Sequence, residues 1–526
     1  MSASPSRATG ARLGSVPPKS WTIVAWAAVA ATSVILTYLI TLALGLALTG
    51  FGFLVALATI SRISFIGILL AAFALIVGVT VLWSLVPRKV SLDLAGTPID
   101  LSREVRLREE LEAIAHAMGE RMPKEVYLIP AANAAVMQFR GERLMLLGLP
   151  LLQLLTVSQF RAVMAHEFAH YYAGDTRLGP WVFKARDSMT RVLVNLTRES
   201  EVLSLLRRWA VIAILHMAII GGLVLYWKLL ARITQYISRR QEFRCDELAC
   251  YVAGSASLEG GLRNVSRAAA GFGAYWSRVV ATATASGIRP QVADGFARFM
   301  AAPAIAQAVE AEMEKRLASD VTGVHDSHPP LSARLRRIRR VGILATNEDE
   351  RPAVALLDDL PGLELGLLQK LAPKVNVAGM KTVGWDSVGS EVYVPMWRKQ
   401  TERLQQLLGP CAVVALPEKL RALPEIANRI PDVPGNLPTR EQRLARVTES
   451  LGLVLTLALV DYGWRLHFQP GQFYLERDSE RLEPGLVMGE LRSGKMTAEG
   501  WEEYCRKRGM GEWALVGGSP TVDQQT

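Results

Sequence analysis

Two histidines flank a glutamate in the segment HEFAH, where His166, Glu167 and His170 are the residues that could do chemistry. Positions i and i+4 of a helix share one face, so both imidazoles can reach the same metal ion. Glu167, beside the first histidine, can hold a water molecule at that ion and take its proton. The alternative is a pair of structural histidines on an ordinary helix, but the 526 residues include only seven histidines. The spacing therefore predicts a hydrolytic metal centre.

A catalytic zinc site also needs a third protein ligand and an open coordination position. The downstream segment SRRQEFRCDELAC offers Glu242, with Asp246 one helical turn later. Glu242 can ligate the metal, and Asp246 can accept a hydrogen bond from a ligand histidine. Taken alone, these two residues could be an exposed acidic pair. Two histidines and one carboxylate argue against a structural site, because structural sites hold four ligands and are usually rich in cysteine.

HEFAH followed by YYAGD, and then RRQEFRCDELA, resembles the HtpX-like membrane zinc metalloproteases and their zinc-dependent CAAX prenyl protease relatives. These are gluzincins, with the pattern HExxHxxxGD followed by ExxxD. The resemblance covers about residues 100–345, and it extends to the architecture of the N-terminus. It implies these roles: zinc ligands His166, His170 and Glu242, general base Glu167, and a steadying role for Asp246.

Two further segments match these relatives. The segment HPPLSAR begins at His328 and ends at Arg334. In the relatives, a histidine and an arginine at this spacing approach the substrate or the transition-state oxygen, where they would stabilise negative charge. Asn133-Ala134 precedes an expected edge strand, and the resemblance implies that this step binds the substrate backbone. The alternatives are a loop histidine before Pro-Pro, and a basic surface, RLRRIRR, that faces solvent or lipid.

Cys245 departs from the family pattern, because the relatives usually carry a small alanine there. Its thiol could reach the zinc or inhibit the site, but a small buried side chain is favoured, since free cysteine behaves as a small hydrophobe. The chain has four cysteines, too few to staple a small secreted fold. They predict reduced thiols in a cytosolic setting.

A mixed domain must position these residues. The helix that holds HEFAH is predicted to begin at an N-cap, Ser158, and to stop at Gly174. Apolar spacing predicts an earlier helix over residues 103–118, and then short strands over residues 126–129, 134–139 and 143–149. We therefore expect a metallopeptidase domain over residues 87–345, mainly helical with a small sheet.

The N-terminus predicts a membrane anchor. Residues 21–86 contain a single charged residue, Arg62. A helix needs about 20 apolar residues to cross a bilayer, so this block suffices for a transmembrane helical hairpin. We expect its turn near Gly50 and Gly52. A cleaved signal peptide has a much shorter apolar region, and a buried hairpin in a soluble protein is disfavoured by the length.

The flanking cations predict the orientation. Residues 1–20 form a basic tail without acids, and the exit after residue 86 is also basic, whereas the turn has Arg62 alone. The positive-inside rule then places the N-terminus and the catalytic domain in the cytoplasm, in a multi-pass cell-membrane protein. The net charge of +10 suits an anionic lipid bilayer. No nucleic-acid recognition module accompanies it.

A third apolar run, residues 209–227, lies between the histidine and glutamate ligands. Because both ligands must meet at one ion, the chain between them must cross the membrane an even number of times. Residues 184–206 are too rich in charge to provide a second crossing. We therefore predict no crossing here, although HtpX-like proteases are expected to have two. Residues 209–230 should dip into the bilayer, lie along it, or pack against the N-terminal hairpin, and Gly221-Gly222 would suit a re-entrant bend.

The family pattern stops near residue 345. Residues 348–350 begin a predicted linker, and residues 346–526 are predicted to be an accessory α+β region. Pro470-Gly471 indicates a hairpin, and Thr497 a helix cap. The apolar run over residues 451–460 is too short to span a bilayer. This region could regulate the protease, select substrates or shield the site.

These patterns together predict an α+β membrane-anchored zinc metalloendopeptidase with one Zn²⁺ per chain and protein or peptide substrates. Family resemblance suggests membrane-protein quality control. CAAX processing is disfavoured, because two firm spans do not make the many-helix chamber of that family. A non-catalytic scaffold that binds extended peptides is an alternative, against which the retained Glu167 counts. A latent protease held shut by its C-terminal region is another. The sequence indicates no oligomeric state.

Overall fold

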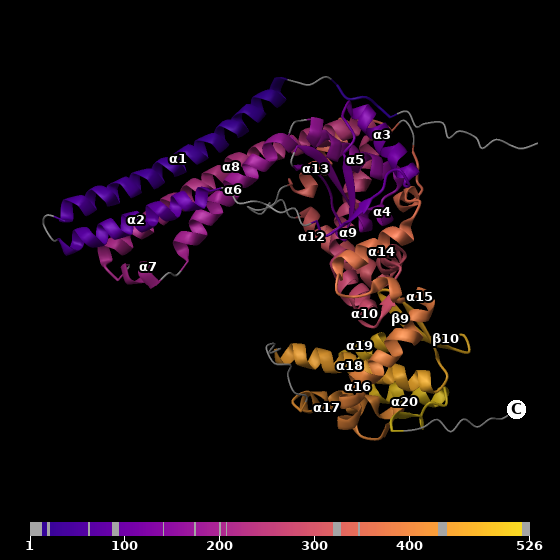
Figure 1. The fold of residues 1–526 in the computed structure, drawn as a ribbon. Helices are drawn as coiled ribbons and strands as arrows, with labels where there is room; N and C mark the ends of the chain where they lie inside the picture. Colours follow the sequence, from indigo (N-terminus) through magenta and orange to yellow (C-terminus); the bar gives the residue numbers. More distant parts are fainter. Residues whose placement is uncertain are drawn as a thin grey trace, which may run out of the picture. The chain divides into compact units, whose positions relative to one another are not determined.

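The computed structural model describes residues 13–17, 21–60, 64–86, 94–139, 141–172, 175–198, 201–206, 208–318, 328–345, 348–429 and 439–517. The chain divides into two compact units (Figure 1). The first comprises Met1–Ala270 and Ala311–Leu371, and the second comprises Gly271–Glu310 and Ala372–Thr526. This division does not coincide with the boundary expected after residue 345.

The first unit carries the apolar helices and the small sheet. Its elements in chain order are α1 (Trp21–Ile60), α2 (Phe65–Leu85), β1 (Thr97–Ile99), α3 (Val105–Met118), β2 (Glu125–Ile129), β3 (Ala134–Phe139), β4 (Glu142–Gly148), α4 (Leu149–Leu154), α5 (Val157–Tyr172), α6 (Asp175–Thr197), α7 (Glu201–Leu206), α8 (Ala210–Ala253), α9 (Ser255–Tyr275, which ends in the second unit), α13 (Leu331–Val341) and α14 (Leu360–Leu371). The predicted mixture of helices with a small sheet is confirmed.

The N-terminal hairpin forms, but its turn is not where we expected it. Helix α1 runs unbroken through Gly50 and Gly52, and α2 begins only at Phe65. A Cβ atom on Gly52 would lie 2.8 Å from the Leu75 side chain, so this glycine lets α1 and α2 pack closely. The prediction of a turn was wrong because a glycine in an apolar helix can serve helix packing as well as a chain reversal.

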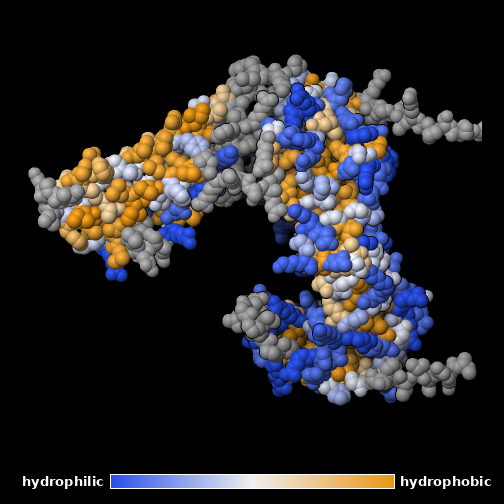
Figure 2. Space-filling model, in the orientation of Figure 1, coloured by the Kyte–Doolittle hydropathy of each residue, from blue (hydrophilic) through white to orange (hydrophobic). Residues whose placement is uncertain are grey.

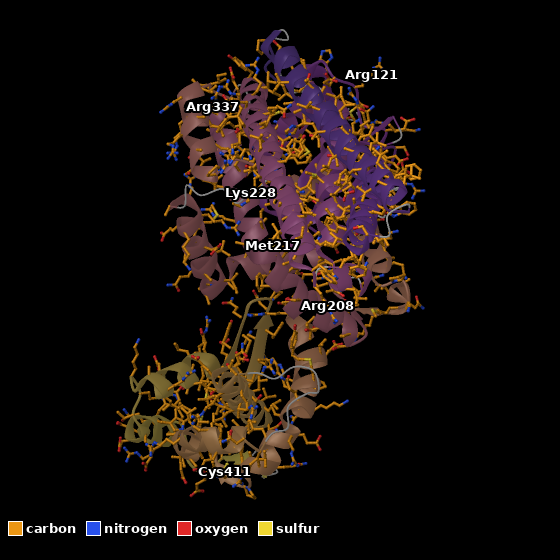
Figure 3. The ribbon with its side chains drawn as sticks, turned by 90° about the vertical axis from the view of Figure 1, so that its left-hand side faces the viewer. Arg121, Arg208, Met217, Lys228, Arg337 and Cys411 are labelled. Carbon is orange, nitrogen blue, oxygen red and sulfur yellow. The ribbon has the colours of Figure 1, made fainter. Side chains whose placement is uncertain are left out.

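Three helices are long and apolar enough to cross a membrane among the described residues. They contain the ranges Ala31–Thr59, Phe65–Leu85 and Ala210–Ala253. Figure 2 shows a mostly hydrophobic surface over the α1–α2 hairpin. On α8 the apolar run lies between Arg208 and Lys228, with Met217 exposed along it (Figure 3).

Helices α6 and α8 pack against the hairpin and carry the chain away from the peptidase fold and back. Buried residues of α2, α6 and α8 share one apolar cluster: Phe73, Val77, Val81, Met189, Val192, Leu196, Ile212 and Leu223. Residues 210–230 lie in α8, which packs against the hairpin and is long and apolar enough to cross a membrane, so the absence of a crossing here stays a prediction. The bend at Gly221-Gly222 is absent, since α8 continues through both glycines. The return path brings the two ligand-bearing helices, α5 and α8, together.

Two charged residues of α6, Asp187 and Arg191, are paired within this bundle. Arg191 pairs with Asp187 and donates to the Ser188 hydroxyl at 2.8 Å and to the Ser84 carbonyl of α2 at 3.2 Å. The Asn195 amide donates to the Ser84 hydroxyl at 2.9 Å. These bonds explain how a helix too polar to span a bilayer alone can pack against an apolar hairpin.

The sheet places an open edge beside the helix that carries HEFAH. Its strand order is β1-β2-β4-β3, with β2 parallel and β3 antiparallel to β4. All three expected strands form, together with the short β1. Helix α5 packs on this sheet and is almost wholly buried, and the Tyr171 hydroxyl donates to the Leu144 carbonyl at 2.7 Å.

The N-terminus of α5 is capped differently from our expectation. Thr156, not Ser158, accepts from the backbone N–H of Gln159 at 3.3 Å. The N–H groups of Val157 and Ser158 donate to the carbonyls of Arg351 and Asp349. The segment predicted to be a linker therefore completes the first turn of α5, and a chain cut at residue 345 would lose these caps.

The second unit has its own core. Its longer elements are α11 (Val292–Ala301), α12 (Pro303–Ala318, which continues into the first unit), α16 (Val394–Leu408), α17 (Leu416–Ala427), α18 (Arg440–Asp461), β8 (Arg465–Gln469), β9 (Gln472–Arg477), β10 (Glu480–Leu482), α19 (Pro484–Ser493) and α20 (Ala498–Lys507). The predicted hairpin forms as β8 and β9, and the Thr497 hydroxyl caps α20 as predicted. The run 451–460 lies inside α18, where most of it is buried.

An internal segment of the chain completes this second core. The Trp385 indole donates to the Gln291 carbonyl at 3.1 Å. A Cβ atom on Gly295 would lie 2.2 Å from the Trp385 ring, so only glycine permits this contact. Residues 271–310 therefore belong structurally with the C-terminal region, which no local sequence pattern indicated.

Candidate active site

Three side chains converge where α5 and α8 pack together. Ligand atoms of His166, His170 and Glu242 all lie within 4.8 Å of one another. His166 Nε2 is 3.4 Å from Glu242 Oε2, and His170 Nε2 is 3.7 Å from Glu242 Oε1. Glu242 Oε2 is buried, and besides His166 it faces the Arg334 guanidinium, whose Nη1 is 3.8 Å away. The donor set therefore fits a metal ion with three protein ligands.

Asp246 and Arg334 both contact the ligand His166. Asp246 Oδ1 lies 3.1 Å from His166 Nδ1, which leaves Nε2 facing Glu242. Arg334 is buried and donates to both oxygens of Asp246, at 2.9 and 2.6 Å. A bidentate contact of this kind fixes both partners. The structure thus places Arg334 as a residue that positions Asp246 and His166; a direct contact with substrate stays a prediction.

Burial and charge act against each other at His166. Burial and the Arg334 charge lower the pKa of His166, but hydrogen bonds with Asp246 and Glu242 outweigh them and raise it to about 9. Burial would likewise lower the pKa of Arg334, yet the adjacent Asp246 charge raises it above its usual range. Because a metal binds neutral imidazole, a metal ion and a proton compete for His166.

A pocket of 210 Å³ opens beside these residues. It brings together most of the site residues expected from the sequence: Asn133, Ala134, His166, Glu167, His328 and Arg334. His328 is half exposed, and its Nδ1 lies 2.8 Å from Glu242 Oε1. Glu167 is 9% exposed, so the pocket supplies its route to solvent and substrate.

Comparison with known proteins agrees with this geometry. The model of peptidase family M48 matches residues 101–341. Protease HtpX from Pseudomonas putida is 28% identical over 243 residues, which is 45% of this chain and 71% of the relative. Protease HtpX from Pseudomonas syringae pv. syringae is 26% identical over the same lengths. Residues 101–341 are therefore similar to the HtpX-like M48 metalloproteases. The predicted family and membrane-anchored protease function are confirmed.

This HtpX-like protease carries a thiol against one of its histidines. Cys245 is fully buried, as expected, and its Sγ lies 3.5 Å from His170 Nδ1. Cys245 therefore contacts the ring nitrogen of His170 that does not face Glu242. A residue at that nitrogen usually fixes the orientation of a ligand histidine. Sequence reasoning favoured burial but could not indicate which ring the thiol would touch.

The N-terminal tail also reaches the two helices that carry the ligands. The Gly14 N–H donates to the Val252 carbonyl at 3.2 Å, at the end of α8. The Tyr172 hydroxyl, at the end of α5, donates to the Pro17 carbonyl at 2.8 Å. A Cβ atom on Gly14 would lie 1.9 Å from the Tyr251 carbonyl oxygen. The tail thus satisfies a terminal carbonyl of α8 and ties both helices together; the sequence carries no signal for this contact.

Replacing Gly14 with valine should detach the tail and loosen the metal site. The new Cβ collides with the Tyr251 carbonyl, which cannot move without shifting the end of α8. We expect about tenfold faster metal loss to a chelator, as when other supports of ligand residues are removed. Ser15→Val is the matched control, because Ser15 is exposed in the same segment. Equal rates of metal loss in both variants would contradict the conclusion that the tail holds α5 and α8 together.

Proposed function

We propose that this HtpX-like protease is a zinc endopeptidase, with one zinc ion held by His166, His170 and Glu242. The observation that carries the proposal is the convergence of two histidines and a buried glutamate beside the pocket that exposes Glu167. Nitrogen and carboxylate ligands in this number favour zinc. When bound, zinc would supply Lewis-acid polarisation of the scissile carbonyl and acidify water.

In this proposal the residues of the chain orient the reactants and move the proton. Glu167 takes a proton from the attacking water and passes it to the leaving amine, which is general base and then general acid catalysis. His328 and Arg334 line the same pocket and act on the oxygen that gains negative charge. Asp246 holds His166 in the tautomer that presents Nε2.

The substrate is proposed to bind as an extended peptide. Strand β3 lies at the edge of the sheet, and Asn133 and Ala134 line the pocket where this strand begins. An extended chain added to β3 would exchange backbone hydrogen bonds along that edge. Such recognition tolerates many sequences, which suits the quality control of unfolded membrane or membrane-proximal proteins.

The site is proposed to face the cytoplasm in a multi-pass membrane protein. The contacts of Gly14 and Pro17 with α8 and α5 support a tail on the same side as the metal ligands. The basic tail and the basic exit of the hairpin then favour the cytoplasmic side. Tagging the N-terminus and measuring its accessibility in sealed, oriented membranes tests this orientation.

The test of the function is cleavage of an unfolded model protein by the full chain purified in detergent. Chelation should abolish cleavage, and return of zinc should restore it, because the ligand set fits that ion. Undiminished cleavage in excess chelator would contradict a metal-dependent mechanism. Failure of the zinc-loaded protein to cleave any unfolded substrate would contradict the endopeptidase.

A further inference from the structure

The pocket beside Glu167 has two chemically different sides. The side near the metal ligands presents His166, Glu167, His328 and Arg334. The rest of the lining includes apolar side chains from three helices, which we call the apolar wall: Leu151 of α4, Val163 of α5, and Leu262 and Val265 of α9. Ser266 adds a hydroxyl to this wall, which contains no charged residue. The wall therefore offers an apolar surface beside reactive groups.

Helix α9 is fixed against the other two helices that form this wall. A Cβ atom on Gly261 would lie 3.0 Å from the Val163 side chain and 3.3 Å from the Gln159 carbonyl, so the glycine permits a close approach. The Asn264 amide donates to the Gln159 side chain at 2.8 Å and to the Leu154 carbonyl at 3.3 Å. Leu262 and Val265 are therefore held in place in the pocket that also contains the reactive groups.

We infer that this wall selects the substrate residue beside the scissile bond, and that it favours an apolar side chain such as Leu, Ile, Met or Phe. The inference rests on the proposed peptidase function and names the specificity of the same site. The structure assigns Val265 as the main determinant of this preference. Val265 lines the pocket, is half-buried, and is not one of the metal ligands, so it can be replaced without altering the metal cluster.

The size of the pocket supports a single side chain as occupant. Its 210 Å³ is below the range of about 300–1,000 Å³ that is usual for whole small-molecule ligands. A peptide added to the β3 edge alternates its side chains between the two faces of the sheet. One substrate residue can then enter the pocket while its neighbours point away.

The chemistry of the wall supports an apolar occupant. A lysine or glutamate side chain against Leu151, Val163 and Leu262 would lose its hydration on a wall that itself carries no charge. An apolar side chain would instead remove its own surface and that of the wall from water. The same argument predicts that a charge introduced into the wall reverses the preference.

The test is a comparison of cleavage sites in a library of unstructured peptides with randomised sequences, using the zinc-loaded full chain. Wild type should show enrichment of apolar residues at one position next to the cleaved bond. Val265→Asp should lower kcat/KM for a peptide with Leu there by about tenfold or more, and raise it for the Arg or Lys analogue. Val265→Phe, which fills the pocket without charge, should shift the preference to Ala or Gly. Ala269→Asp is the control, because Ala269 is exposed on α9 and outside the pocket.

Two results would overturn this inference and leave the peptidase intact. One is cleavage by wild type without an apolar preference at any position beside the bond. The other is a preference in both Val265 variants that matches that of Ala269→Asp. Absence of all cleavage by the zinc-loaded wild type is a different result, since it would refute the proposed function on which the inference depends.

Discussion

Glu167→Gln should lower kcat by about 10²–10⁴-fold while zinc remains bound, because general base catalysis typically contributes that factor. Glutamine keeps the size of the side chain but cannot accept the proton of the attacking water. Glu167 is outside the cluster of three ligand side chains, so metal content should not change. The measurement is the rate of peptide cleavage at saturating substrate, paired with the zinc content of the same sample.

Glu112→Gln is the matched control for this substitution. Glu112 is exposed on α3 and only weakly paired with Arg108, at 3.7 Å. It should therefore keep wild-type activity. A Glu167→Gln enzyme with activity within a few-fold of this control would show that another group takes the proton, and would refute the role assigned to Glu167.

Arg334→Leu should lower the free energy of unfolding by about 3–5 kcal/mol, the usual cost of removing one partner of a buried ion pair. Asp246 would remain buried beside His166 with its charge no longer neutralised by the guanidinium. We also expect about 10–100-fold weaker zinc binding, since Asp246 would no longer be held on the ligand histidine. Denaturant unfolding with and without zinc, and a zinc titration, measure the two effects.

Two further variants separate charge from shape in this experiment. Arg334→Lys keeps the charge but not the two-pronged contact, and should recover only part of the loss. Arg340→Leu removes an exposed arginine from the same helix, and should have little effect. Equal stability of Arg334→Leu and Arg340→Leu would contradict the supporting role of Arg334.

The metal cluster could be predicted because its pattern is local. His166 and His170 are one helical turn apart, so spacing alone places both rings on one face. Glu242 and Asp246 repeat that spacing on a second helix, and a zinc site needs a third ligand from somewhere. The structure brings these four side chains together as the spacing indicated.

Contacts between distant segments could not be predicted in the same way. Gly14 lies against the end of α8 because its missing side chain fits there, and nothing near residue 14 encodes that neighbour. The caps at the start of α5 could not be predicted either, because they come from the backbone carbonyls of Asp349 and Arg351, and any residue type has such a carbonyl. Segment 349–351 therefore looked like a linker although it belongs to the peptidase fold.

Glycine was the ambiguous signal in the helices. Gly52 was interpreted as a turn and proved to be a packing contact, while Gly221-Gly222 lie in a continuous helix. The same residue type can break a helix or let two helices approach closely, and the choice depends on neighbours that arrive from elsewhere in the chain. Residues 271–310 belong to the second unit, and this could not be predicted either, because it depends on contacts with segments that are distant in the sequence.

The central claim is that His166, His170 and Glu242 hold one zinc ion, and the most direct measurement is the zinc content of purified Glu242→Gln. We expect about one zinc per chain in wild type and almost none in the variant, because two histidines alone rarely hold zinc. Glu247→Gln is the control on the same helix; Glu247 pairs with Arg244 at 3.0 Å and should leave zinc content unchanged. Full zinc occupancy in Glu242→Gln would contradict the assigned ligand set and the mechanism built on it.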